Sequence, residues 1–159
     1  MTSPVTIRIQ TADFDVAREI AALTASRTDI GAVVTFSGIC RGTEGGDATT
    51  ALTLEHYPGM AEEEIERIMA DARARWPLAG ATVIHRYGRM LPGDNIVLVV
   101  TASAHRGAAF AAAEFLMDWL KTRAPFWKLE EHAQERAWVA AKEHDDDAAG
   151  RWTPTRPIP

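Results

Sequence analysis

The order of hydrophobic patterns along the chain predicts an α+β fold. Segments in which apolar residues recur at every second position indicate strands, and segments in which they recur every three to four positions indicate helices. In chain order they give strand, helix, two strands, helix, two strands, helix and two strands. Helices interspersed among mostly antiparallel strands argue against a doubly wound parallel sheet. The length of 159 residues and the 47% hydrophobic content fit one globular domain.

The first part of the chain is predicted to hold three strands around one helix. Residues 4–10 (PVTIRIQ) alternate as a strand with one buried face, and a helix follows that Thr11 or Asp13 can cap. Residues 31–39 (GAVVTFSGI) are apolar on both faces, which predicts a central strand. This strand is expected to pair with residues 50–57 (TALTLEHY) across a glycine-rich loop.

An amphipathic helix and two more strands are predicted for the middle of the chain. The helix covers residues 58–76, and its inward face consists of Ile65, Ile68, Met69 and Ala72. The strands cover residues 80–88 and 95–103 and are separated by the turn-forming sequence LPGD, residues 91–94. The second strand is apolar throughout, so we expect it to be central in its sheet.

The last part of the chain begins with an unusually apolar helix. Residues 107–123 are apolar nearly all round, which predicts burial on several sides, within the domain or under a partner subunit. A final hairpin follows over residues 126–141. From residue 143 a charge run and prolines predict a mobile tail, so we expect one domain over residues 1–142 and a tail over residues 143–159.

Composition narrows the class of protein. The net charge of −5 argues against a general nucleic-acid binder, because phosphate contacts need a basic surface. No apolar run approaches the ~20 residues of a membrane span. The first ten residues do not resemble a signal peptide, and the single cysteine cannot form an internal disulfide. We therefore expect a cytoplasmic protein.

Lysine is scarce in this chain. The 17 basic residues are 14 arginines and 3 lysines, namely Lys121, Lys128 and Lys142. Lys121 lies near the end of the apolar helix, where its amine is either partly desolvated in a pocket or extended to water. Lys128 and Glu130 share one face of the next strand, close enough to Lys121 to form a common pocket. An exposed Lys–Glu ladder is the alternative, but the scarcity of lysine elsewhere favours the pocket.

Three other basic residues could bind an anion. His105 and Arg106 open the apolar helix, where backbone N–H groups, an imidazole and a guanidinium together suit a phosphate. Simple N-terminal capping is the alternative. Arg41 leaves the strand of residues 31–39 at the glycine-rich loop, from which it could reach the same ligand or lie on the surface. The residues alone thus predict an anion pocket lined by two lysines, which favours an enzyme.

The remaining reactive side chains are given structural interpretations. Cys40 is interpreted as a small buried hydrophobe, and His56 and His85 as structural residues inside strands. The histidines near the C-terminus lack the spacing of metal ligands, and neither a Rossmann fingerprint nor a nucleotide phosphate loop occurs. We therefore expect no metal and no cofactor.

Five segments of the chain form a specific pattern. They are GAVVTFSGICR, LTLEHYPGM, RWPLAGATVIHRYGRMLPGD, SAHRGAAF and MDWLKTRAPFWKLE. Together they resemble the catalytic (large) subunit of molybdopterin synthase, from about residue 29 to about residue 140. The resemblance implies an α/β hammerhead fold with an additional antiparallel β subdomain. It also implies a central dimer of large subunits with one small subunit at each far end.

The resemblance implies a sulfurtransferase of molybdenum cofactor biosynthesis. In that family, precursor Z (cyclic pyranopterin monophosphate) receives two sulfurs and becomes molybdopterin. The sulfur is carried as a C-terminal Gly-Gly thiocarboxylate on a small ubiquitin-like subunit, and the tail of that subunit enters a pocket of the large subunit.

The resemblance assigns roles to individual residues. Lys121 and Lys128 match the family's two essential lysines, while Arg41, His105 and Arg106 match its pterin and phosphate contacts. Its substrate-pocket stretches match residues 39–41 and 128–130, which adds Ile39, Cys40, Leu129 and Glu130 to the expected site. Where some members carry a lysine, this chain has Ile39, so that amine is lost. A persulfide on Cys40 is a minor alternative, because the sulfur arrives on the partner.

Two other functions compete with sulfur transfer. One is a binding module that holds a ubiquitin-like tail without catalysis, and the other is a lysine Schiff-base enzyme acting on a phosphorylated carbonyl compound. The full set of matched basic residues favours the sulfurtransferase, because tail binding alone does not require His105, Arg106 and both lysines.

Overall fold

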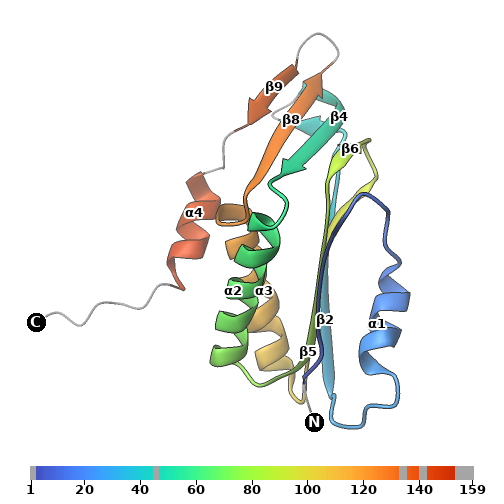
Figure 1. The fold of residues 1–159 in the computed structure, drawn as a ribbon, viewed down its shortest axis with the longest axis vertical. Coiled ribbons are helices and arrows are strands. Elements are labelled where there is room, and N and C mark those ends of the chain that lie inside the picture. The colour runs from blue at the N-terminus through green and yellow to red at the C-terminus, as the bar shows by residue number, and fades with distance from the viewer. Residues whose placement is uncertain (1–2, 45–46, 133–135, 140–142, 153–159) are drawn as a thin grey trace, which may run out of the picture.

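The computed structural model describes residues 3–44, 47–132, 136–139 and 143–152. Its elements are β1 (Val5–Gln10), α1 (Val16–Thr24), β2 (Ala32–Ile39), β3 (Thr43–Glu44), β4 (Asp47–His56), α2 (Met60–Arg75), β5 (Leu78–Arg86), β6 (Gly88–Met90), β7 (Asn95–Ser103), α3 (Arg106–Thr122), β8 (Phe126–His132), β9 (Arg136–Val139) and α4 (Glu143–Gly150) (Figure 1). The predicted α+β class is confirmed. None of the helices in these described ranges combines the length and the apolar character needed to cross a bilayer.

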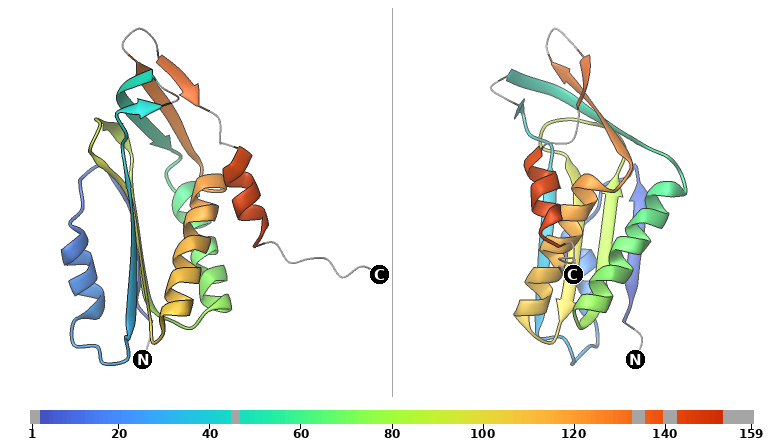
Figure 2. Two further views of the ribbon diagram at one scale, coloured as in Figure 1. Left: turned by 180° about the vertical axis from the view of Figure 1, so that it is seen from behind. Right: turned by 90° about the vertical axis from the view of Figure 1, so that its left-hand side faces the viewer.

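The larger sheet has the strand order β1-β5-β7-β2. β1 runs parallel to β5, and the other two pairs are antiparallel. Helix α1 covers one face of this sheet, and α2 and α3 cover the other (Figures 1 and 2). The central position of β7 is confirmed, but β2 lies at the edge, so the prediction of a central strand there was wrong. Apolar residues on both faces of a strand do not show how many neighbours it has, and β2 leaves Phe36 and Ile39 exposed.

The second sheet is antiparallel and has the order β3-β4-β8-β9. Strand β6 also pairs with β4, on the edge of β4 that faces away from β8. The sequence predicted that β4 pairs with β2. Instead β4 pairs with β8 over most of its length, and β2 pairs with β7. Such pairings join segments far apart in the chain, and the local pattern of β4 is equally compatible with either partner.

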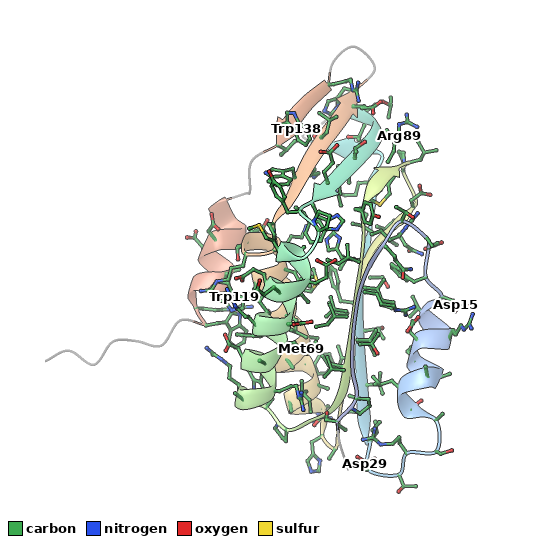
Figure 3. The ribbon with its side chains drawn as sticks, in the orientation of Figure 1. Asp15, Asp29, Met69, Arg89, Trp119 and Trp138 are labelled. Atoms are coloured by element: carbon green, nitrogen blue, oxygen red, sulfur yellow. The ribbon has the colours of Figure 1, made fainter. Side chains whose placement is uncertain are left out.

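The helices bury the faces that their spacing predicts. All four predicted inward residues of α2 are buried, and Met69 points toward the larger sheet (Figure 3). Helix α1 begins later than expected, because Asp15 caps it by accepting a hydrogen bond from the Arg18 backbone N–H at 3.1 Å. Asp13 instead accepts a hydrogen bond from the Asn95 side chain at 2.9 Å, so it ties the preceding loop to β7 rather than capping the helix.

Helix α3 is the most enclosed helix, as its composition predicts. It packs against α2, α4, β2 and β7, and Phe115 and Leu116 are fully buried. Phe110, however, is 62% exposed, so one apolar position of this helix faces outward. The prediction of burial on several sides is therefore confirmed, and one apolar patch remains uncovered in the single chain.

The chain after residue 142 differs from the predicted mobile tail. Residues 143–150 form α4, which packs along α3. Arg151 then pairs with Glu114 and Asp118 of α3, at 2.6 and 2.8 Å, and the Trp152 indole N–H donates to Asp118 at 2.6 Å. The sequence did not predict this helix, because the run of charges indicates no buried face and the residues that anchor the helix to α3 follow that run. The predicted tail residues 153–159 lie outside the described residues.

Candidate active site

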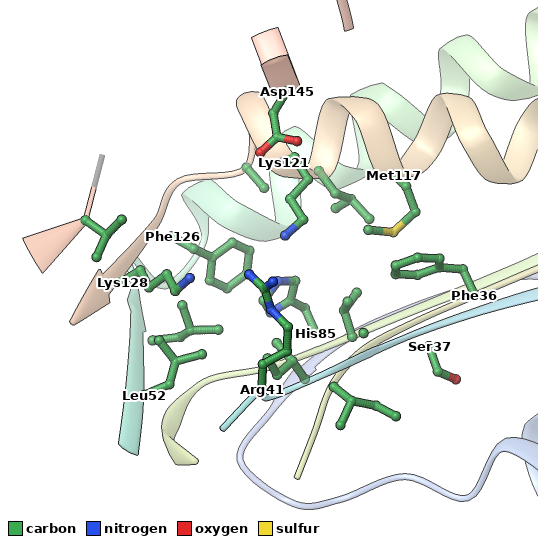
Figure 4. A pocket seen from close by; sticks show the side chains of 18 residues that line it. Phe36, Ser37, Arg41, Leu52, His85, Met117, Lys121, Phe126, Lys128 and Asp145 are labelled. Atoms are coloured by element: carbon green, nitrogen blue, oxygen red, sulfur yellow. The ribbon is translucent and has the colours of Figure 1, made fainter. Parts of the chain in front are cut away.

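A cavity of about 640 Å³ opens between the end of α3 and the two sheets. Its lining includes Arg41 from the end of β2, Lys121 from the last turn of α3 and Lys128 from β8 (Figure 4). Asp145 of α4 also lines it, close to Lys121 in the view of Figure 4. Segments far apart in sequence thus bring three cationic side chains to one cavity, as the clustering of the lysines predicts.

The two lysines meet because α3 ends abruptly. The Arg123 N–H donates to Trp119 O at the last turn, and the Phe126 N–H donates to Ala124 O at 2.8 Å in the tight turn that follows. Proline at position 125 has no backbone N–H and cannot continue the helix. Strand β8 therefore starts within a few residues of Lys121 and carries Lys128 into the cavity.

Lys128 is held by a buried carboxylate. Its Nζ lies 2.9 Å from Oε1 of Glu130, which is only 5% exposed, and the other oxygen of Glu130 lies 3.4 Å from Nε2 of His132. The predicted common face of Lys128 and Glu130 is confirmed by this pair. A carboxylate that is out of water and shared between two basic side chains fixes the position of the lysine amine.

The segment after β2 places Arg41 and Cys40 differently. A register shift between Gly38 and Ile39 ends the regular pairing with β7, after which Arg41 reaches the cavity. The Cys40 side chain turns away into a small core, and burial raises the pKa of its thiol. A thiol that stays protonated is a poor nucleophile, so the structural interpretation of Cys40 is supported.

Not all predicted site residues line this cavity. Ile39, Arg41, Lys121 and Lys128 do so. Cys40, which directly follows β2, and Leu129 and Glu130 of β8 do not line it. His105 and Arg106 lie at the opposite end of α3, which is about 25 Å long at 1.5 Å per residue. Within one chain, the structure therefore does not bring His105 and Arg106 together with the lysines. The sequence pattern placed both groups on one helix, but at its two ends.

Comparisons with known proteins identify the family. The family described as MoaE protein matches residues 9–123 of the chain. A molybdopterin synthase catalytic subunit of Mesorhizobium japonicum is 66% identical over 149 residues, which cover 92% of each protein. The chain belongs to this family. It is therefore an enzyme of molybdopterin biosynthesis, of the catalytic-subunit type.

Solved structures of the MoaE family share the fold. The molybdopterin biosynthesis MoaE protein from Burkholderia ambifaria is 50% identical, with a TM-score of 0.80 over 93% of this chain and 97% of that one. A complex of subunits 1 and 2 of the molybdopterin-converting factor from Helicobacter pylori contains a chain that is 22% identical. Its TM-score is 0.65, over 85% of this chain and 89% of that chain, which shows the same fold.

Sequence reasoning missed one feature of this MoaE-family cavity, namely its aromatic wall. His85 of β5 lines the cavity with its ring stacked on Phe126, with 3.8 Å between ring centroids and 14° between planes. Burial lowers the pKa of His85 from 6.5 to about 4, so its ring is neutral at physiological pH. The alternation of β5 was the available signal, because it places His85 on the face of the sheet that α3 covers.

The cavity combines groups that suit an anion and a carbonyl. Guanidinium and ammonium groups donate hydrogen bonds and attract negative charge, and a lysine amine can also transfer a proton or attack a carbonyl carbon. Phe36 and Phe126 contribute an apolar part to the wall of the cavity. This arrangement can therefore bind an anionic ligand beside a carbonyl group and stabilise charge that develops on it.

Proposed function

We propose that this protein transfers sulfur to precursor Z, converting the cyclic pyranopterin monophosphate to molybdopterin. Two sulfurs are inserted, and each arrives as a thiocarboxylate at the Gly-Gly C-terminus of a small ubiquitin-like subunit. The observation that carries the proposal is the meeting of Arg41, Lys121 and Lys128 in one cavity of a MoaE-family chain. A phosphorylated pterin and a peptide tail are both anionic, and these three side chains compensate that charge.

Each cation has a distinct part in the proposal. Lys121 lies nearest the thiocarboxylate carbonyl, which its amine polarises or attacks. Lys128, held by Glu130 at 2.9 Å, takes part in proton transfer as the pterin ring opens. Arg41 holds an anionic oxygen of the substrate through its planar guanidinium. Together they keep the acyl group and the pterin in contact while sulfur moves between them.

The partner is proposed to be the small subunit of the synthase. The Helicobacter pylori structure contains two different subunits of the converting factor, and one of its chains shares the fold of this protein. A ubiquitin-like subunit would insert its extended tail into the cavity between α3 and β8. The cavity is wide enough for a peptide tail to lie beside a small ligand, at about 640 Å³.

A second copy of the chain is proposed to complete the assembly. Phe36 and Ile39 of edge strand β2 are 40% and 52% exposed, and Phe110 of the neighbouring helix α3 is 62% exposed. Large exposed apolar side chains on an edge strand and on the helix packed against it suit a symmetric dimer contact. In such a dimer His105 and Arg106 of one copy would serve the cavity of the other, which reconciles their matched identity with their distance from Lys121.

The test is direct reconstitution. The protein is mixed with precursor Z and with the small subunit in its thiocarboxylate form, and molybdopterin is measured by conversion to a fluorescent derivative. The matched control is the same small subunit with an ordinary carboxylate. Product in the first mixture alone supports the proposal. Absence of product from both mixtures, with the three components shown to be intact, contradicts it.

A further inference from the structure

His85 is the one histidine among the described residues that lines the cavity. It is 8% exposed, and its ring is clamped by the stack on Phe126. On β5 it follows Ala81 and Val83 on the face that packs against α2 and α3, where apolar side chains fill the core. His85 thus occupies a core-facing position of β5 that borders the cavity. Packing alone does not explain a polar imidazole at this position.

The hydrogen bond of His85 fixes its tautomer. Nδ1 lies 2.9 Å from the carbonyl oxygen of Arg86, and because a carbonyl can only accept, Nδ1 carries the hydrogen. In the neutral ring Nε2 then has a lone pair and no hydrogen. Among the described residues, Thr49 Oγ1 is the one buried side-chain polar atom sealed off without a partner. Nε2 of His85 has no partner among the described residues, yet it is not such a fully buried atom. It is therefore accessible, and the cavity that His85 lines is where a ligand can contact it.

The charge state of the ring is fixed as well. The pKa of His85 is lowered to about 4 by burial first, and then by the positive charge of Lys121 and by His56, while the Arg86 carbonyl acts in the opposite direction. The ring is therefore a neutral acceptor over the whole physiological range. By contrast, Arg41, Lys121 and Lys128 in their charged forms donate hydrogen bonds and cannot accept them.

A ligand with hydrogen-bond donors needs such an acceptor. The three cations donate hydrogen bonds to anionic and carbonyl oxygens of a ligand. An N–H or O–H group of the ligand carries a positive partial charge on its hydrogen, so these cations would repel it. Ser37 and Asp145 also carry acceptor oxygens, but Ser37 lies away from the lysines, and Asp145 belongs to α4 on the other side of Lys121 (Figure 4). His85 lines the same cavity as Arg41 and Lys121.

We propose that Nε2 of His85 accepts a hydrogen bond from a ring N–H or O–H group of the substrate and thereby determines which heterocycle the cavity takes. The inference rests on the proposed function and deepens it. The cations select for the charged and carbonyl parts of the ligand, and His85 selects for a donor at one position of its ring. A site that offers an acceptor discriminates strongly, because an unsatisfied buried polar group weakens binding of a ligand without the matching donor.

Two substitutions separate this role from packing. His85→Phe keeps an aromatic ring against Phe126 and removes the acceptor, whereas His85→Gln keeps an acceptor oxygen at similar reach and loses the stack. Binding of precursor Z is measured by calorimetry without the small subunit, and turnover is measured with the thiocarboxylated small subunit. We expect His85→Phe to raise Kd and KM about 10-fold or more with a smaller change in kcat, and His85→Gln to stay within about 3-fold of the wild type.

The outcomes are distinguishable from those of a packing role and from failure of the proposed function. If His85→Phe binds as tightly as the wild type, or if His85→Gln is as weak as His85→Phe, the assignment of His85 is overturned. A wild-type protein that does not bind precursor Z overturns the proposed function itself. Should His85→Phe not fold, the ¹⁵N resonance of Nε2 in the wild type decides: a shift on adding precursor Z supports the contact, and an unchanged resonance overturns it.

Discussion

Two adjacent glutamates of β8 form different ion pairs, and only one of these pairs includes a lysine of the cavity. Glu130 is 5% exposed and joins Lys128 to His132, whereas Glu131, next in sequence, points to the other face of β8 and pairs with Arg89 and Arg136 at 3.5 Å. Strand alternation alone predicts that Lys128 and Glu130 share a face. It does not predict the burial of the carboxylate, which depends on the pairing of β4 with β8.

Replacing Glu130 tests the importance of this pair. We expect Glu130→Gln to lower turnover about 10-fold or more, because Lys128 loses the carboxylate that positions its amine. Glu131→Gln is the matched control and should stay within about 2-fold of the wild type, since its partners Arg89 and Arg136 are exposed and such surface ion pairs contribute little. Molybdopterin formation measures both variants. Equal activity of the two variants would contradict the role given to Glu130.

The neutral state of His85 predicts how stability depends on pH. The folded protein keeps this ring neutral down to a pKa of about 4, whereas the unfolded chain binds the proton near its ordinary value of 6.5. The neutral ring of His85 therefore contributes fully to the free energy of unfolding above pH 6.5. This contribution is lost as the pH falls toward 4, by up to about 3 kcal/mol. Urea unfolding at pH 7 and pH 4.5 measures it. His85→Phe should lose less stability than the wild type over this interval, and an identical loss would contradict the assignment.

At the scale of elements, sequence patterns located most helices and strands but not all their partners. Helix α3 and strands β5 and β7 follow from their apolar patterns, because each has a buried face. Strand β8 follows from its alternation, although Glu130 is its one buried residue. Neither the pairing of β4 nor the edge position of β2 follows from it, since both depend on contacts between distant segments. The very short strands β3 and β6 exist only through their pairing with β4.

Helix α4 is an element whose stability depends on its anchor. Trp152 packs edge-on against Trp76 and Phe115, with ring centroids 5.6 Å apart in both pairs, and its indole N–H donates to Asp118. We expect Trp152→Ala to lower the free energy of unfolding by about 1–3 kcal/mol, since the side chain is only partly buried. Trp138→Ala, at a position that is 59% exposed, is the control and should change little. Thermal and urea unfolding of both variants measure this, and equal losses would contradict the anchor.

At the scale of the whole molecule, one chain supplies the cavity but leaves His105 and Arg106 at the far end of α3. The sequence placed these residues in the expected site because it carries no information on which copy contributes them. The proposed dimer accounts for the separation. It also accounts for the exposed apolar side chains of β2 and α3, which a chain working alone would leave in water.

A charge in the proposed dimer contact tests the assembly. Phe110→Asp should shift the protein to a monomer in sedimentation velocity, because an unpaired carboxylate would be buried in an apolar contact. Tyr57→Asp, at a similarly exposed position near the second sheet, should leave the dimer intact. A wild-type monomer, or a dimer that survives Phe110→Asp, would contradict the arrangement.

The central claim is that Lys121 acts on the sulfur-bearing carbonyl in the cavity. Its most direct test is molybdopterin formation by Lys121→Ala with precursor Z and the thiocarboxylated small subunit, beside measurements of small-subunit binding and melting temperature. The account predicts that dithiolene formation is abolished while binding and folding are unchanged, because the amine acts on the reacting group rather than on the fold. Unimpaired turnover by Lys121→Ala would contradict it.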